Sequence, residues 1–212
     1  MKVHHARSWL ETGFPLLVYG IVAGILFQDY QWRINPDYIS YIGIAQKYSR
    51  GDFFHAVNGY WSPLFSWLLA PLLWSGGDPL VVSKVLALGV GGVAIVGIRR
   101  FFLALGVTGS VSFPLLLAAV PLVLSSAFLE AGPDLLLATL LIHYLGRTLP
   151  ASYPGRVRDG LWTGMLGGLA YLSKTYAFYF FLLHYLLMQA GRYARRASPG
   201  ERAMVMKSLG VG

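Results

Sequence analysis

The chain has 212 residues, of which 56% are apolar and only 12% are charged, with no cysteine and a net charge of +8. Soluble domains carry about 25% charged residues, so this composition excludes a water-soluble globule, and the lack of cysteine excludes disulfides and thiolate metal sites. The basic residues lie between long apolar runs. We therefore expect an all-α integral membrane protein, a polytopic transmembrane helix bundle of about six spans, rather than a nucleic-acid-binding protein.

The first apolar run covers about residues 9–27, and no small-residue cleavage site follows it. We expect it to remain as a signal anchor. The next segment, residues 29–78, contains two shorter helical stretches, about 36–49 and 62–75, and each begins with an Asn or Ser cap followed by proline. Because both are too short to span and are rich in Tyr and Trp, we predict interfacial helices in an outer loop.

Three further spans are predicted at about residues 79–103, 111–129 and 133–147, and two prolines inside the second of these predict a kinked helix. The stretch 161–190 is about 30 residues long, which is too long for one untilted span. Basic residues flank both of its ends, and such residues favour the cytoplasmic side. We therefore predict a hairpin of two spans with Lys174 at its turn.

The charges also predict how the chain sits in the inner or plasma membrane. With a cytoplasmic N-terminus, most of the 17 basic residues fall on the cytoplasmic side, as the positive-inside rule requires. Six of the nine acids fall on the outer side: Asp29, Asp37, Asp52, Asp78, Glu130 and Asp134. The acids at 29, 52 and 78 are interpreted as solvated loop residues. Asp37 and Asp134 each begin a predicted helix, as a cap or as a functional carboxylate.

Five short motifs follow one another along residues 30–180. They are Asp37-x3-Tyr41-x2-Ile44-Ala45, Gly51-Asp52-Phe53, Pro63-Leu64 with Trp67, Pro133-Asp134-Leu135-Leu136-Leu137, and Gly168-Leu169-Ala170-Tyr171-Leu172-Ser173-Lys174. This series resembles the GT-C glycosyltransferases, in particular the protein O-mannosyltransferase and aminoarabinose-transferase group. The resemblance implies that residues 1–212 form one transmembrane domain, the N-terminal part of a longer GT-C module. Such an enzyme transfers a sugar from a polyprenyl-phosphate carrier to an acceptor on the outer face.

The resemblance also implies roles for the two acids that begin helices. An acceptor hydroxyl must lose its proton as it attacks the anomeric carbon, so the reaction needs a general base. Asp37 is the expected base. Asp134 is expected in the same cleft, where it would orient the acceptor or Asp37. These two are the candidate catalytic residues.

The candidate substrate-binding residues are Lys174, Tyr41, Trp61 and Glu130. Lys174 would face the carrier phosphate as a point charge, or it is a snorkelling lysine. Trp61 would stack on a sugar face. The expected partners are membrane lipids and the lipid-linked donor, with the acceptor (protein, lipid or glycan) and the need for a divalent metal left open.

The chain departs from the family pattern at two places, next to Asp37 and at Trp61. Asp37 is followed by Tyr38, where the family often has a second acid, and Trp61 stands where the family often has Lys or His. A transporter or flippase for a lipid-linked sugar is the main alternative, and it would be expected to carry polar residues in mid-span or broken helices. A structural subunit is the second alternative, and it predicts that Asp37, Asp134 and Lys174 lie apart.

Overall fold

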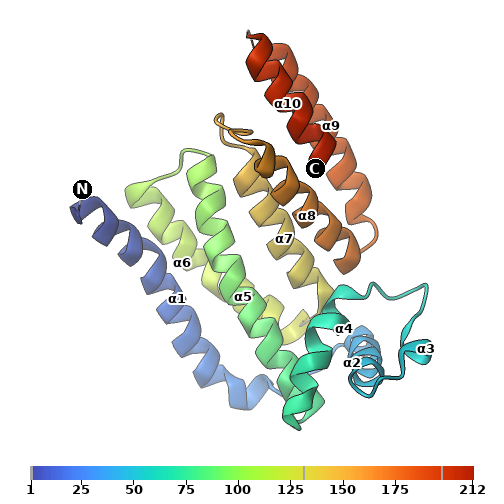
Figure 1. Cartoon of the computed structure of the whole chain (residues 1–212). Helices are drawn as coiled ribbons and strands as arrows, with labels where there is room; N and C mark the ends of the chain where they lie inside the picture. The colour runs from blue at the N-terminus through green and yellow to red at the C-terminus, as the bar shows by residue number, and fades with distance from the viewer. Residues whose placement is uncertain (1, 131, 197) are drawn as a thin grey trace.

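The computed structural model describes residues 2–130, 132–196 and 198–212, with side chains from residue 10 onward. All the secondary structure of these residues is helical (Figure 1). The long helices are α1 (Lys2–Tyr30), α5 (Pro79–Ala104), α6 (Gly109–Ser125), α7 (Pro133–Thr148), α8 (Val157–Ser173) and α9 (Ala177–Arg195). The shorter elements are α2 (Pro36–Ser49), α3 (Phe53–Ala56), α4 (Leu64–Leu69), the 3-10 helix η1 (Ala70–Ser75), the π-helix η2 (Ser126–Glu130) and α10 (Pro199–Val211).

Three helical segments are long and apolar enough to cross a membrane: Leu10–Tyr30, Pro79–Ala104 and Gly109–Glu130. Helices α7 and α8 have 16 and 17 residues, fewer than the roughly 20 that a hydrocarbon layer of about 30 Å requires. Helix α9 has 19 residues but carries two arginines in its last turn. The chain is thus an all-helical protein with three candidate membrane spans, and the arrangement of six spans remains a prediction.

The ends of the bundle differ in what they carry. The N-terminus, the α5–α6 connection and the α7–α8 connection lie at one end, whereas α2, α3 and α4 gather at the other (Figure 1). Helix α10 folds back and packs against α8 and α9. The predicted separation of the basic connections from the outer-loop helices is therefore present in the fold.

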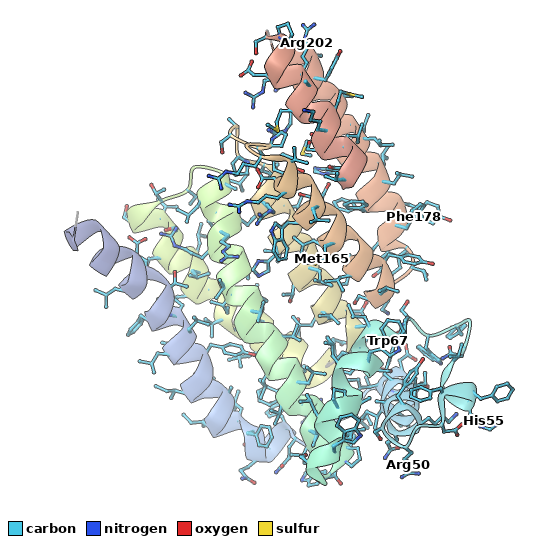
Figure 2. The ribbon with its side chains drawn as sticks, viewed as in Figure 1. Arg50, His55, Trp67, Met165, Phe178 and Arg202 are labelled. Atoms are coloured by element: carbon cyan, nitrogen blue, oxygen red, sulfur yellow. The ribbon has the colours of Figure 1, made fainter. Side chains whose placement is uncertain are left out.

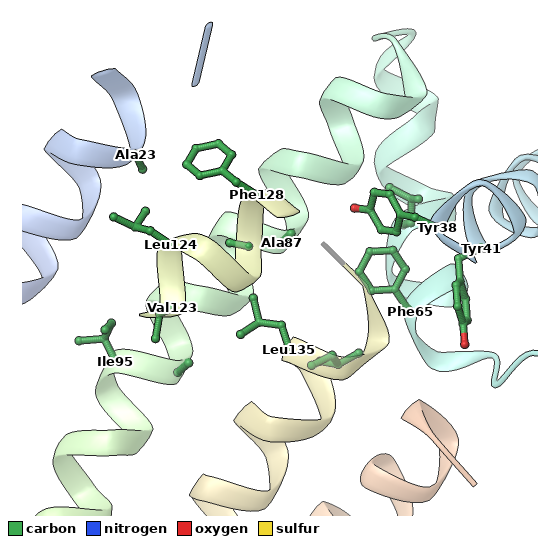
Figure 3. Close-up of a cluster of buried hydrophobic side chains, with 14 of the residues drawn as sticks. Ala23, Tyr38, Tyr41, Phe65, Ala87, Ile95, Val123, Leu124, Phe128 and Leu135 are labelled. Carbon is green, nitrogen blue, oxygen red and sulfur yellow. The ribbon is translucent and has the colours of Figure 1, made fainter. Parts of the chain in front are cut away.

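Local sequence explains helix α2. The side chain of Asn35 caps the helix by accepting a hydrogen bond from the backbone N–H of Asp37 at 3.1 Å, and Pro36 occupies the first turn. Tyr38 and Tyr41 lie on its buried face, against α4, where they pack around Phe65 (Figure 3). Helix α2 has nearly the predicted bounds. The second predicted outer-loop helix is observed as α4 followed by η1, without a side-chain cap at its start, and both pack against α2.

A buried ion pair fastens α1 to α5. Arg99, which the sequence places at the basic end of the second span, is only 7% exposed, and its guanidinium pairs with the carboxylate of Glu11. The helix continues beyond this arginine to Ala104. Arg99 is therefore a structural charge inside the bundle, while the neighbouring Arg100 is exposed.

The predicted turn at Lys174 is present between two helices, although neither helix is among the three candidate membrane spans. Helix α8 ends at Ser173, Lys174 has extended backbone angles, and α9 begins at Ala177. The two helices approach closely at Gly167, where an added Cβ atom would lie 2.3 Å from the ring of Phe181. At the adjacent Gly168 an added Cβ would meet nothing within 4 Å.

We expect Gly167→Ala to destabilise the hairpin by about 1–3 kcal/mol, the usual cost of overpacking a core, because the Phe181 ring must move. Gly168→Ala is the matched control, and it should be neutral or slightly stabilising because alanine favours helix. Reversible unfolding in mixed micelles, followed by circular dichroism, measures both. Equal stabilities of the two variants would show that α8 and α9 do not pack as described.

The topology prediction can be tested by thiol labelling, because the chain has no cysteine of its own. A membrane-impermeant reagent added from outside should label Asp52→Cys and leave Val157→Cys unlabelled. Permeabilised cells should label both variants and so act as the control. Labelling of Val157→Cys in intact cells as readily as of Asp52→Cys would reverse the assigned sides.

Candidate functional site

Two of the predicted site residues form an ion pair. The Nζ atom of Lys174 lies 3.2 Å from a carboxylate oxygen of Asp134. Asp134 is in the first turn of α7 and Lys174 follows the last turn of α8, and the hydroxyl of Ser173 donates a hydrogen bond to the carbonyl of Pro133 at 2.9 Å. The start of α7 and the turn of the hairpin therefore form one edge of the bundle, as a shared site requires.

Tyr41 connects this edge to helix α2. Burial raises the pKa of its hydroxyl to about 12, and the carboxylates of Asp134 and Asp37 contribute to this rise, together with Tyr176 and Tyr60. The carboxylates of two different helices thus both raise the pKa of this hydroxyl. A phenol with this pKa stays protonated at neutral pH, so it can donate a hydrogen bond to a ligand oxygen.

The carboxylate of Asp37 is available for chemistry. It is exposed in the first turn of α2, and among the described residues it has no hydrogen-bond or ion-pair partner. Its neighbour Asn35, by contrast, donates from its side-chain amide to the carboxylate of Glu130 at 3.1 Å. Glu130 therefore joins the end of η2 to the cap of α2, so it has a positioning contact rather than a free carboxylate.

Aromatic rings form one wall beside the acids. The ring of Trp61 packs edge-on against Tyr41, with centroids 5.1 Å apart, and Tyr60 packs against Trp61 at 4.7 Å. The side chain of Asn58 accepts hydrogen bonds from the backbone N–H groups of both Tyr60 and Trp61, which fixes this loop. Tyr60 is 82% exposed, so the outermost ring is the one open to a ligand.

Sequence reasoning missed Lys84, which lies just inside the apolar run that forms α5. It is fully buried, it donates to the carbonyl of Phe128 at 2.6 Å, and its ammonium lies 5.3 Å from the centroid of the Tyr38 ring. A lysine inside an apolar run is expected to have a buried partner, and this was the available signal. Tyr60 and Asn58 carried no comparable signal.

The described residues include no group of three or more His, Asp or Glu side chains placed to hold a metal ion. Comparison with known proteins gives no match to a family model, to a protein of curated function or to a solved structure. Function is therefore inferred from the residues and their geometry alone.

We expect two ion pairs of the chain to differ sharply in their effect on stability. Asp134→Asn should change the free energy of unfolding by less than about 1 kcal/mol, because this carboxylate is 57% exposed. Glu11→Gln should cost about 3–5 kcal/mol, because it leaves the Arg99 guanidinium buried without its counter-charge. Unfolding in mixed micelles measures both. A large loss for Asp134→Asn would make that pair structural.

Proposed function

We propose that this chain is a membrane glycosyltransferase of the GT-C type, or its N-terminal part, which transfers a sugar from a polyprenyl-phosphate carrier to an acceptor on the outer face. The observation that carries the proposal is the Asp134–Lys174 ion pair beside Tyr41, on the helix that bears Asp37. Two acids, a cation and an aromatic wall from separate parts of the sequence therefore meet at one end of the bundle.

The proposed reaction uses the exposed carboxylate of Asp37 as the general base. The acceptor hydroxyl gives its proton to Asp37 while its oxygen forms a bond to the anomeric carbon of the donor sugar. The bond between that carbon and the phosphate oxygen breaks, and its electron pair leaves with the polyprenyl phosphate. Asp134 accepts a hydrogen bond from the acceptor and orients it. Asp37 is the one acid in the sequence of α2.

Lys174 supplies the positive charge for the carrier phosphate. Its ion pair with Asp134 is partly solvated, with side-chain exposures of 25% and 57%, so exchanging the carboxylate for a phosphate costs little, on the order of 1 kcal/mol or less. The protonated phenol of Tyr41 can donate to a phosphate or sugar oxygen in the same place. The leaving phosphate thereby meets a cation and a hydrogen-bond donor.

A cavity beside the hairpin turn suits the carrier chain. It has a volume of about 780 Å³ and is lined by Thr175 and Tyr176, which directly follow Lys174, by glycines of α8, and by aromatic side chains of α9 that include Phe178. Tyr176 also acts on Tyr41 electrostatically. An isoprenoid chain in this cavity would leave its phosphate next to the lysine.

The arrangement of charges also bears on the alternative of a transporter. The buried charges of α5 lie toward its two ends: Lys84 is near the first turn, and Arg99 is near the last. Neither lies at the middle of the span, where a transporter is expected to bind its substrate. The acids and the cation of the candidate site are grouped at an edge, which favours chemistry at the membrane interface.

We expect Asp37→Asn to preserve folding and to lower turnover by about 10²-fold or more, the usual scale for loss of a general base. The assay is release of polyprenyl phosphate from polyprenyl-phosphate mannose, and from other hexose and pentose donors, by the whole chain in liposomes with a membrane extract as the source of acceptor. Asp29→Asn is the matched control, since it removes another exposed outer acid.

The outcomes separate the alternatives. Full turnover in Asp37→Asn would remove this residue from the catalytic role. A wild-type chain that moves labelled donor across the bilayer but breaks no sugar–phosphate bond would be a transporter. A chain that neither binds nor cleaves any of the donors would contradict the proposal as a whole.

A further inference from the structure

A second cavity lies between α5, α7 and α8 toward the end of the bundle that carries the α5–α6 and α7–α8 connections (Figure 1). Its volume is about 850 Å³, and its lining includes Arg100, Arg147 and Trp162. Met165, which is labelled in Figure 2, also lines the cavity. The cavity shares no residue with the candidate site at the other end of the bundle, so a ligand bound in it is independent of the proposed function.

The lining of this cavity carries positive charge, and part of that charge is not paired with a carboxylate. Arg100 is exposed and has no hydrogen-bond or ion-pair partner among the described residues. Arg147 lies 3.6 Å from the carboxylate of Asp159, and its guanidinium lies 5.9 Å from the centroid of the Trp162 ring. Of these two guanidinium groups, only that of Arg147 is paired with a carboxylate, which leaves a net positive charge for an anion.

The cavity beside Arg192 at the end of α9 offers a useful contrast. It is also lined by arginines and has a volume of about 690 Å³. There, however, Arg192 donates to the backbone carbonyls of Thr148, Pro150 and Tyr153, and Arg196 pairs with Glu201 at 3.0 Å. Those two guanidiniums are already used to join α9 and α10 to the end of α7. The third arginine of that lining, Arg195, is exposed, but it lies at the end of α9, which is not among the candidate membrane spans, whereas Arg100 lies on α5, which is.

The remaining lining of the α5–α7–α8 cavity is largely apolar. It includes Leu103 and Ala104 from the end of α5, and Met165 and Leu166 from α8. Helix α5 is a candidate membrane span whose last residue is Ala104. Along α8, Met165 and Leu166 lie farther from that end of the bundle than Trp162, so these two residues form the apolar wall toward the hydrocarbon layer. Leu103 and Ala104 follow Arg100 toward the end of α5. A free phosphate ion would make no use of those apolar walls.

We propose that this cavity binds one anionic glycerophospholipid, with its phosphate between Arg100 and Arg147 and the start of an acyl chain against Met165 and Leu166. Basic pockets between membrane helices are suited to such headgroups. Trp162 borders the glycerol region, where indole rings prefer to lie. The bound lipid bridges α5, α7 and α8 at the end of the bundle that carries their connections.

Trp162 makes the proposal measurable, because brominated acyl chains quench a nearby indole. The whole chain, with its five other tryptophans replaced by Phe, is placed in nanodiscs of phosphatidylcholine with a minor fraction of brominated phosphatidylglycerol or brominated phosphatidylcholine. We expect the brominated anionic lipid to quench more strongly at equal fraction. Native mass spectrometry of the unaltered chain, which should retain an anionic lipid in preference to a neutral one, covers the case in which the single-tryptophan chain does not fold.

The matched variants separate a specific site from general attraction of lipid by positive charge. R100Q/R147Q should lower the preference for the anionic lipid by about tenfold or more, since each basic residue at the surface contributes several-fold. R156Q/R158Q removes two exposed charges from the adjacent segment, outside the cavity lining, and should keep the preference. R100Q alone, which breaks no ion pair, should lower it in part.

Three results would overturn the proposal. Equal quenching by the two brominated lipids would exclude selectivity for the anionic headgroup. Equal losses in R100Q/R147Q and R156Q/R158Q would reduce the effect to overall charge on that side of the membrane. Displacement of the lipid signal by inorganic phosphate would make the cavity a site for a free anion instead.

Discussion

The hydrogen bond from Lys84 to the carbonyl of Phe128 holds the candidate site in place. The last carbonyls of a helix have no partner within it, and an apolar interior offers no water to replace one. The ammonium of Lys84 supplies the partner at 2.6 Å, and it also lies over the ring of Tyr38. This one residue therefore joins α5 to the end of η2 and to α2. Glu130 and Asp134, which lie at and just beyond that end, keep their positions relative to Tyr41 as a result.

The same constraint organises the rest of the bundle. Inside a membrane, a polar group without a partner costs several kcal/mol, so most buried ones are matched by another helix. The exceptions among the described residues are the hydroxyl of Tyr38, one guanidinium nitrogen of Arg99 and the amide oxygen of Gln189. The hydroxyl of Tyr19 on α1 donates to the carbonyl of Leu88 on α5 at 2.8 Å, and Arg99 of α5 pairs with Glu11 of α1. Arg192 of α9 satisfies carbonyls at the end of α7. These contacts use buried polar groups, and they leave the exposed Asp37 and Arg100 for ligands.

The two ends of the bundle consequently present different chemistry. One end has carboxylates, a lysine and an aromatic wall, and these suit a sugar acceptor and a lipid-linked phosphate. The other end has arginines above apolar walls, and these suit a structural lipid. Both proposed ligands are lipids with anionic headgroups, but they meet the chain at opposite ends. The cation at the first end is paired with a carboxylate that a phosphate can displace, whereas Arg100 at the second end has no such competitor among the described residues. A cation whose partner can be displaced suits a site that exchanges substrate. An unpaired cation suits a site that keeps one structural lipid.

Local sequence determined the helical class, the bounds of α2 and of the helix ending at Ser75, and the hairpin turn at Lys174. Each has a nearby signal, such as the Asn35 cap, a Gly after the last turn or an apolar run interrupted by a charge. Sequence did not determine how many helices span the membrane, because α7 and α8 are shorter than the roughly 20 residues that a span needs. Only tertiary structure paired Asp134 with Lys174, buried Lys84 and made Arg99, at the basic end of the second predicted span, a partner of Glu11. These contacts join residues 40 or more positions apart, and they depend on which helix faces meet, which local patterns do not encode.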